Sequence, residues 1–395
     1  MMSGLARRMR GMQRSTIREI LKLTQQKDII SFAGGLPAPE LFPLKKFTLA
    51  MEETLTTDGV SALQYDVTEG YRPLKEFLCS WLGRQGIACG PENMMLTNGS
   101  QQALDLLGKI YLDPGDEVLV ENPTYLGAIQ AFNAYQTRYL TVPMDDEGID
   151  IEQSRSILER KHPKFAYLVP TFQNPSGVTM TEQRRLGFLE TARRKRLPVV
   201  EDDPYSYLRF HGKVVPSMYQ LAGGQGVIYL STFSKTLSPG IRLGFVVAEP
   251  EIITSLVLAK QAADLQPNSL IQRAVYHYCK RGFLDEHIPV IIEAYRQRAD
   301  TMLAAMQREF PPSVSWVKSE GGMFIWCRLP RKASASRLFK KAIENKVAYV
   351  TGSVFHANGG GDNTLRLNFT NSTQEQIQEG IKRLGKIFRS HPGMS

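Results

Sequence analysis

Residues 227–248 read VIYLSTFSKTLSPGIRLGFVVA, and this stretch decides the fold that we expect. Two short apolar runs, 227–230 and 245–248, enclose a polar loop that carries a lysine, an arginine and several hydroxyl side chains. Apolar runs of this length are typical of strands that are buried on both faces of a sheet. The stretch therefore predicts two buried strands joined by a polar loop whose side chains can bind a ligand or take part in catalysis.

Similar apolar runs occur earlier in the chain, at 117–120, 165–169 and 197–201, and helical patterns separate them. Strands that alternate with helices favour an α/β fold with a largely parallel central sheet covered on both faces. In such a sheet, ligands bind beyond the carboxyl ends of the strands. Polar segments follow several of these runs, so we expect a binding site at that edge.

A second, smaller α+β unit is expected after a helical stretch at 288–310. Its expected strands and helices are 315–317, 323–326, 335–345, 364–369 and 374–388. The chain should thus divide into three parts. These are an N-terminal segment (1–45) with a helix at 15–24, a large α/β domain (46–285) and a small C-terminal domain (286–395).

Composition excludes several classes of protein. The 395 residues are 42% hydrophobic and 22% charged, and no run of 18 apolar residues predicts a membrane span. The net charge of +9 comes from scattered basic residues, which favours a solvated surface with sites for small anions over nucleic-acid binding. The four cysteines lack metal-ligand spacing and are expected to be reduced, structural thiols. No metal is therefore expected. The basic N-terminus lacks the apolar core of a signal peptide, so we expect a cytoplasmic protein.

The loop after 227–230 suits a phosphorylated aldehyde cofactor. Lys235 can form a Schiff base with an aldehyde, because an amine of lowered pKa is a good partner for carbonyl chemistry. Thr232, Ser234 and Arg242 can hold the phosphate, Arg242 through its planar fork of donors. Taken alone, this pattern indicates an ordinary surface lysine more than a Schiff-base lysine. The polar segments that follow the other strands favour the Schiff-base interpretation.

A helix expected at 102–110 opens on Gly99, Ser100 and Gln101. Helix N-termini favour phosphate because they present unpaired backbone N–H groups and the positive end of the helix dipole. Gly99 lets the backbone approach a ligand closely. An ordinary N-cap by Ser100 is the alternative.

Other polar residues after the strands suit the ring of such a cofactor. Asp202 can keep a pyridine nitrogen protonated; the alternative is that Asp202 or Asp203 simply caps a turn before Pro204. Tyr205 and Asn174 can donate to a phenolic oxygen. Tyr125 can stack on the ring, although it fits a core aromatic residue equally well.

Arg366 lies in the expected strand 364–369 of the small domain. A guanidinium binds an α-carboxylate through two parallel hydrogen bonds, so Arg366 is the expected substrate clamp. An arginine on an exposed strand face is the alternative.

These motifs, in this order, resemble the fold-type-I, pyridoxal-phosphate-dependent aminotransferases of class I/II, over about residues 15–388. The resemblance implies pyridoxal 5′-phosphate as cofactor and a homodimer in which two subunits share each site. It implies that Lys235, Asp202 and Tyr205 are catalytic and that Tyr65 reaches the neighbour's phosphate. The other cofactor contacts that it implies are Ser100, Gln101, Tyr125, Asn174, Thr232, Ser234 and Arg242.

The segments at 15–24 and 30–39 and the run FHANGGG at 355–361 resemble bacterial 2-aminoadipate aminotransferases more narrowly. That resemblance implies an N-terminal helix over the substrate, with Ser15 and Arg18 at the substrate and Arg18 pairing with its side-chain carboxylate. Gly34 and Gly35 should lie against the substrate, because only glycine lets a backbone pass that close. Asn174 and Arg366 complete the expected substrate contacts.

The expected reaction moves an amino group from an L-amino acid to 2-oxoglutarate by a ping-pong mechanism. We expect 2-aminoadipate first among the donors, with broad tolerance, and branched-chain or aromatic amino acids second. A β-lyase of the same fold is one alternative, because fold alone does not fix the reaction. A ligand-sensing domain of a transcription regulator is another, but the roughly thirty residues before the matched region are too few for a DNA-binding domain.

Overall fold

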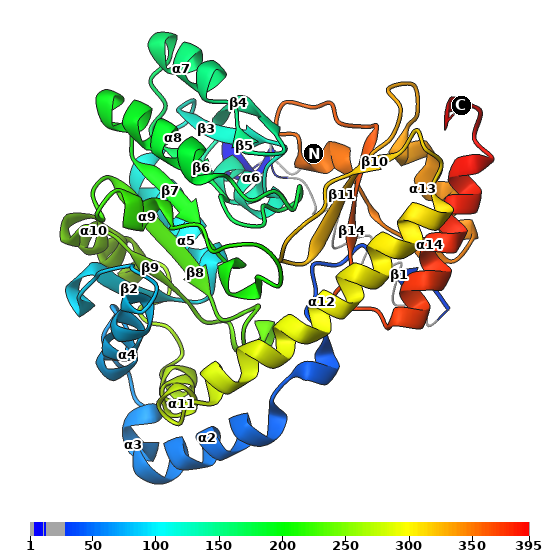
Figure 1. Cartoon of the computed structure of the whole chain (residues 1–395). Helices are drawn as coiled ribbons and strands as arrows, with labels where there is room; N and C mark the ends of the chain where they lie inside the picture. Colours follow the sequence, from blue (N-terminus) through cyan, green and yellow to red (C-terminus); the bar gives the residue numbers. More distant parts are fainter. Residues whose placement is uncertain (1–3, 11, 13–27, 395) are drawn as a thin grey trace.

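The computed structural model describes residues 4–10, 12 and 28–394. The expected helix at 15–24, with Ser15 and Arg18, lies outside the described residues. Two sheets dominate the described chain, and the longest of its described helices, α12 (Phe283–Glu309), runs between them (Figure 1). This helix covers the stretch expected at 288–310 and begins already at Phe283, after Gly282 in a left-handed conformation.

The larger sheet has eight strands in the order β2-β9-β8-β7-β6-β3-β4-β5. Strands β8, β7, β6, β3 and β4 run parallel, whereas β9 is antiparallel to both of its neighbours and β5 is antiparallel to β4. The strands are β2 (Met94–Thr97), β3 (Glu117–Asn122), β4 (Arg138–Asp145), β5 (Gly148–Ile149), β6 (Ala166–Leu168), β7 (Val199–Asp202), β8 (Val227–Thr232) and β9 (Gly244–Val247). The expected largely parallel α/β sheet is therefore confirmed.

Helices cover both faces of this sheet, as the apolar runs predict. Along β8, Ile228 and Leu230 belong to one buried cluster and Val227 and Tyr229 to the other, because successive side chains of a strand point to opposite faces. Residues of α5 (Ser100–Tyr111), α6 (Leu126–Asn133), α10 (Pro250–Gln261) and α12 fill the first cluster. The second takes residues from α4 (Arg72–Gly83), α7 (Ile151–Arg160), α8 (Glu182–Lys195), α9 (Met218–Leu221) and α11 (Ser269–Lys280).

The smaller sheet is antiparallel, in the order β10-β11-β14-β13, and it packs with helices into the expected α+β unit. Its strands are β10 (Ser315–Trp316), β11 (Phe324–Arg328), β13 (Val350–Thr351) and β14 (Thr364–Asn368), and its helices are α13 (Ala335–Glu344) and α14 (Gln374–Arg389). A short parallel pair, β1 (Ile30–Ser31) with β12 (Val347–Ala348), ties the N-terminal segment to this unit.

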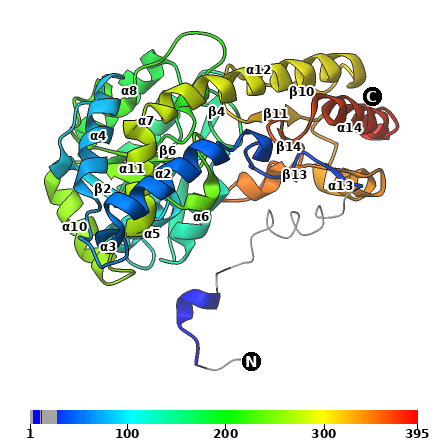
Figure 2. The ribbon, with the colours of Figure 1, turned by 90° about the horizontal axis from the view of Figure 1, so that it is seen from below.

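Helices α2 (Leu44–Thr57) and α3 (Gly59–Ala62) lie along α11 at the outer side of the large sheet (Figure 2). No helix among the described residues is long and apolar enough to cross a membrane. The described part of the chain also contains no cluster of His, Cys, Asp and Glu that suits a metal ion. The domain boundaries at residues 45 and 285 remain predictions.

Candidate active site

A cavity of about 400 Å³ lies at the carboxyl ends of β6, β7 and β8, between the large sheet and the small one. Most of the residues that the sequence singled out line it. The lining residues are Gly35, Ser100, Gln101, Tyr125, Val169, Asn174, Asp202, Pro204, Tyr205, Thr232, Ser234, Lys235, Pro239, Arg242, Phe324 and Arg366. These residues come from separate segments of the chain. Each segment follows a strand or precedes a helix, which is why they were expected to meet at this edge of the sheet.

Lys235 is carried by the loop between β8 and β9, which is closed by a hydrogen bond from Phe233 N to Leu243 O. Its Nζ atom donates to the carbonyl oxygen of Gly35 at 2.9 Å. Burial lowers the pKa of Lys235 to about 8, and the nearby positive charge of Arg366 lowers it in the same direction. A substantial fraction of this amine is therefore uncharged and nucleophilic near neutral pH, unlike an ordinary surface lysine.

Asp202 ends β7, and its carboxylate is buried. Oδ2 accepts a hydrogen bond from the hydroxyl of Tyr167 at 2.7 Å, whereas Oδ1 has no hydrogen-bond partner among the described residues. Burial raises the pKa of the Asp202 carboxyl to about 7. A buried oxygen without a donor is costly, and this one belongs to a residue that lines the cavity, so it fits a ligand that brings an N–H group. The pyridine nitrogen of pyridoxal phosphate is such a group.

The turn-cap alternative for Asp202 is wrong, because Asp203 fills that role: its Oδ1 accepts from Ser206 N at 2.9 Å. Tyr167 is a residue that sequence reasoning missed. It lies in the run at 165–169, where a buried tyrosine is indistinguishable from any other core aromatic residue.

Arg366 lies on β14 and is 1% exposed, so the alternative of an exposed strand face is wrong. Its Nη1 donates to Asn174 Oδ1 at 2.7 Å, and its Nη2 donates to Ala33 O at 2.8 Å. The guanidinium carbon lies 4.1 Å from the ring centroid of Phe324 and 5.0 Å from that of Phe355. Within the described chain no Asp or Glu pairs with it, and burial lowers its pKa to about 10.

This arginine is therefore a buried cation held by aromatic faces and neutral oxygens. A buried charge without a counter-ion favours an anionic ligand. Asn174 also donates through Nδ2 to the hydroxyl of Tyr205 at 3.2 Å, so its side chain links Arg366 to Tyr205.

The other end of the cavity gathers hydrogen-bond donors around the start of α5. Gly99 is the N-cap residue, with φ of 77°, and Ser100 is the first helical residue, so the alternative of an N-cap by Ser100 is wrong. The positive φ is strained for any residue with a side chain, and a Cβ atom on Gly99 would also lie 2.6 Å from Arg242 Nη2, so both features favour glycine here. The hydroxyls of Thr232 and Ser234, which also line the cavity, are 2.9 Å apart.

Gln101 and Tyr125 also line the cavity. Gln101 donates through Nε2 to Gly127 O at 2.9 Å, which fastens it to α6. Tyr125 is the N-cap residue of α6, and burial raises the pKa of its phenol above the usual value. The ring is therefore neutral and available for stacking.

Two of the expected residues within the described chain do not line this cavity. Gly34 is buried beside Gly35 but is not part of the lining. Tyr65 is 79% exposed on the surface after α3.

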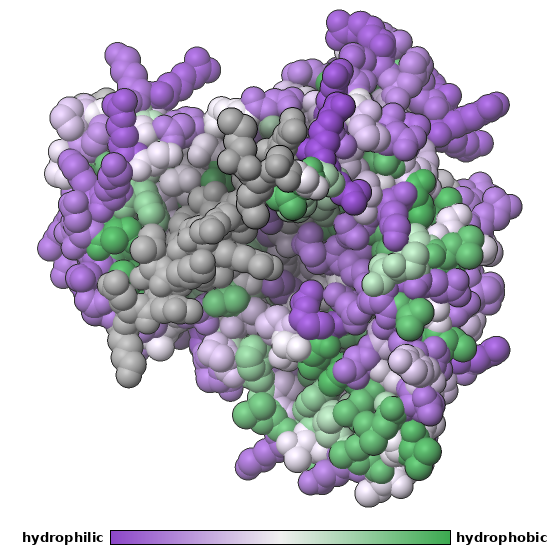
Figure 3. Space-filling model, turned by 180° about the vertical axis from the view of Figure 1, so that it is seen from behind, coloured by the Kyte–Doolittle hydropathy of each residue, from purple (hydrophilic) through white to green (hydrophobic). Residues whose placement is uncertain are grey.

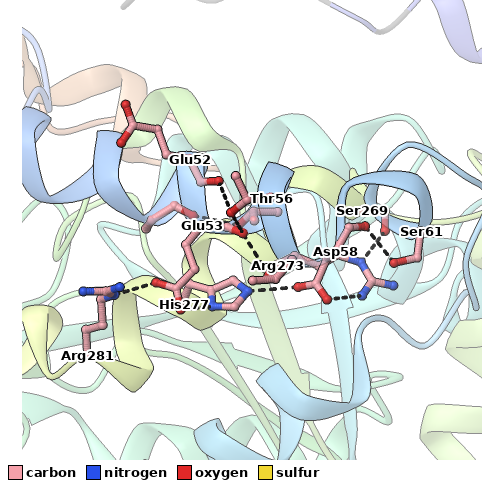
Figure 4. A network of polar contacts seen from close by, with 12 residues as sticks. Glu52, Glu53, Thr56, Asp58, Ser61, Ser269, Arg273, His277 and Arg281 are labelled. Atoms are coloured by element: carbon pink, nitrogen blue, oxygen red, sulfur yellow. Dashed lines mark hydrogen bonds and ion pairs between the residues drawn. The ribbon is translucent and has the colours of Figure 1, made fainter.

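The segment that leads from the end of α2 through α3 toward Tyr65 is fastened to α11 by a network of polar contacts, in which Asp58 lies beside Arg273 and His277 (Figure 4). Arg273 Nη2 lies 3.0 Å from Asp66 Oδ2, and His277 Nε2 lies 2.9 Å from Asp58 Oδ2. The network holds this segment against α11 at the surface of the chain.

Comparisons with known proteins agree with this geometry. The family model "Aminotransferase class I and II" matches residues 27–384. The 2-aminoadipate transaminase of Thermus thermophilus is 48% identical over 380 residues, which cover 95% of this chain and 94% of that protein. The aromatic-amino-acid aminotransferase 1 of Thermococcus litoralis is 45% identical over 385 residues, covering 96% of this chain and 92% of that protein.

The crystal structure of the α-aminoadipate aminotransferase LysN of Thermus thermophilus, complexed with N-(5′-phosphopyridoxyl)-L-leucine, has the same fold. It matches with a TM-score of 0.91 at 46% identity and covers 98% of this chain and 97% of that chain. The mostly parallel sheet and the lysine-containing cavity at its edge define a pyridoxal-phosphate-dependent enzyme of fold type I. The chain belongs to the class I and II aminotransferases and transfers amino groups between amino acids and oxo acids.

Proposed function

We propose that the cavity holds pyridoxal phosphate with its phosphate at the start of α5 and its ring nitrogen at Asp202. The observation that carries this assignment is that Lys235, the unpaired Oδ1 of Asp202 and the unpaired cation of Arg366 meet in one cavity of the described chain. The phosphate would be held by Ser100, Gln101, Thr232, Ser234 and Arg242, with Tyr125 stacked on the ring. Asn174 and Tyr205 would donate to the phenolic oxygen.

Pyridoxal phosphate supplies an aldehyde that bonds an amine and a ring that withdraws electrons from the substrate's α-carbon. The protein residues supply the remaining functions. Asp202 Oδ1 holds the proton of the pyridine nitrogen, because a carboxylate beside that nitrogen favours its charged form. Lys235 Nζ would bond the aldehyde, and the same amine, held beside the substrate's α-carbon, would move the α-proton as general base and acid.

Arg366 would bind the α-carboxylate of the substrate, with Asn174 orienting the guanidinium. The carbonyl oxygens of Ala33 and Gly35 accept from Arg366 and Lys235. These contacts support the proposal that the backbone at Gly34 and Gly35 lies directly beside the substrate. Retention of the carboxylate at Arg366 favours transamination over decarboxylation.

For the substrates, we propose 2-aminoadipate as the preferred amino donor, with branched-chain and aromatic amino acids accepted, and 2-oxoglutarate as the acceptor. The similarity to a 2-aminoadipate transaminase and to an aromatic-amino-acid aminotransferase supports this order. Ser15 and Arg18 of the N-terminal segment would face the substrate side chain, Arg18 pairing with a side-chain carboxylate.

We also propose a cytoplasmic homodimer in which Tyr65 completes the neighbour's phosphate site. Apolar side chains gather on the surface over α2 and α3 (Figure 3). The exposed ones there are Leu44, Leu49, Leu55, Val60, Leu63, Tyr65 and Val67. An exposed apolar patch next to the proposed Tyr65 contact is what a subunit interface requires.

A half-reaction tests the proposed function. Purified protein loaded with pyridoxal phosphate is mixed with one L-amino acid and no acceptor, and the oxo acid and ammonia released are quantified. Transamination predicts about one oxo acid per subunit, no ammonia, and the fastest release with 2-aminoadipate and glutamate. Continuous release of oxo acid together with ammonia would instead establish a β-lyase. No oxo acid from any donor would contradict both activities.

A further inference from the structure

Four polar side chains behind the Gly99 end of the cavity form a closed hydrogen-bond network, here called the brace: Asn98, Gln102, Lys260 and Asp264. Asp264 Oδ2 accepts from Asn98 Nδ2 and from Gln102 Nε2, each at 2.5 Å. Lys260 Nζ donates to Asp264 Oδ1 at 2.6 Å and to Gln102 Oε1 at 2.7 Å. Each member of the brace therefore contacts at least one of the two charged residues.

The ion pair at the centre of the brace is unlike an ordinary surface pair. Lys260 lies in the last turn of α10, and its side chain is wholly buried, whereas the side chain of Asp264 is 28% exposed. Exposed pairs four residues apart contribute little to stability. A buried ammonium is costly unless it is paired and hydrogen-bonded, and the brace meets this requirement.

The brace fixes the main chain that leads into α5. Gln102 Oε1 also accepts from Asn98 N at 2.9 Å, and Asn98 O accepts from Arg242 Nη2 at 3.4 Å. Asn98 is thus held at its amide, its side chain and its carbonyl. The next residue is Gly99, whose left-handed conformation brings the backbone against Arg242.

All four members of the brace lie outside the set of residues that line the cavity. We propose that Lys260 and Asp264 are positioning residues for the phosphate of the cofactor. They hold the Asn98–Gly99 turn so that the start of α5 and the guanidinium of Arg242 converge on one point. This inference rests on the proposed placement of the phosphate at that end of the cavity. A carboxylate is needed at position 264 because its two oxygens accept from three donors.

The test compares two cofactor forms, because a phosphate-positioning role acts only on the form that has a phosphate. Cofactor-free, full-length protein is titrated with pyridoxal phosphate and, separately, with pyridoxal, and the dissociation constants are measured by absorbance. The variants are Asp264→Asn, which removes the charge without changing the side-chain shape, and Lys260→Met, which removes the buried ammonium. Lys109→Met is the matched control, since Lys109 donates across the same contact of α5 with α10, to Ala259 O at 3.1 Å.

We expect both brace variants to bind pyridoxal phosphate about tenfold more weakly, the effect of one misplaced hydrogen bond to a charged group. Their affinity for pyridoxal should stay within about twofold of that of the unaltered protein, and Lys109→Met should change neither constant. Equal weakening for both forms, or none for either, would overturn the proposal. If Lys260→Met does not fold, the two dissociation constants of Asp264→Asn are sufficient to test the proposal.

The same titration separates this inference from the proposed function. If the unaltered protein binds pyridoxal phosphate no more tightly than pyridoxal, the proposed phosphate site itself is wrong. If the unaltered protein prefers the phosphorylated form and Asp264→Asn keeps that preference in full, only the role of the brace is wrong.

Discussion

Replacing Asp202 with asparagine should stabilise the cofactor-free protein while it removes function. The Asp202 carboxyl is buried, its Oδ1 atom has no protein partner among the described residues, and burial raises its pKa from 3.8 to about 7. Ionised Asp202 is therefore a cost to the fold, which the hydrogen bond from Tyr167 offsets in part and a bound, protonated pyridine nitrogen would offset further. Asparagine has nearly the same shape and carries no charge, so the variant is free of this cost.

The sign and size of the effect follow from the pKa. A carboxyl with a raised pKa in the folded chain holds its proton more tightly there than in the unfolded chain. Its contribution to stability is full below about pH 4 and is lost as the pH rises through about 7. The difference between 3.8 and about 7 corresponds to about 4 kcal/mol in the free energy of unfolding. Asparagine does not titrate, so the variant's advantage should grow with pH toward that value.

Urea unfolding of the cofactor-free proteins at pH 5 and pH 8, followed by circular dichroism, measures this difference. We expect Asp202→Asn to be more stable than the unaltered protein, and much more so at pH 8 than at pH 5. Tyr167→Phe is the matched variant of opposite sign, because it removes the donor to Asp202 Oδ2 and should destabilise the protein mainly at pH 8. An unchanged stability of Asp202→Asn at pH 8, or an equal gain at both pH values, would refute the reasoning.

Three further predictions concern the other groups in the cavity. Because burial lowers the pKa of Lys235 to about 8, the rate at which cofactor-free protein bonds pyridoxal phosphate should rise with pH around a midpoint of about 8, and a stopped-flow midpoint near 10.5 would contradict this. Gly99→Ala should weaken cofactor binding by about tenfold, because the added Cβ displaces Arg242; an unchanged dissociation constant would mean that the turn tolerates the methyl group. Arg366→Lys keeps the charge but loses the fork of donors, so KM for amino donors should rise about tenfold or more in steady-state assays, whereas a change in kcat alone would argue against a carboxylate clamp.

The sequence predicted the parts of the site that depend on position after a strand. Lys235, Asp202 and Asn174 each follow a buried apolar run, and parallel strands bring their carboxyl ends to one edge, so their convergence could be foreseen. Arg366 could be singled out only as an arginine in a strand of the small unit. Its burial between two aromatic rings depends on tertiary packing that no local pattern reveals.

The residues that were missed are those whose neighbours are distant in the chain. Tyr167 follows the pattern of an ordinary core strand, and its partner Asp202 lies on the next strand. Lys260 and Asp264 have the spacing of a solvent-exposed helix pair, and only the packing of α10 on α5 shows that Lys260 is buried against Gln102. Strand β4 was also missed. Its exposed and buried side chains do not alternate regularly, so its sequence lacks the period-two pattern of a half-buried strand.

The proposed function depends above all on Lys235 as the residue that bonds the cofactor. The most direct test is to load the protein with pyridoxal phosphate, reduce the bond with sodium borohydride, digest the protein and locate the modified lysine by mass spectrometry. We expect one phosphopyridoxyl group per chain, on the peptide that contains Lys235, and its loss in Lys235→Ala. A stoichiometric label on any other lysine, with Lys235 unmodified, would contradict it.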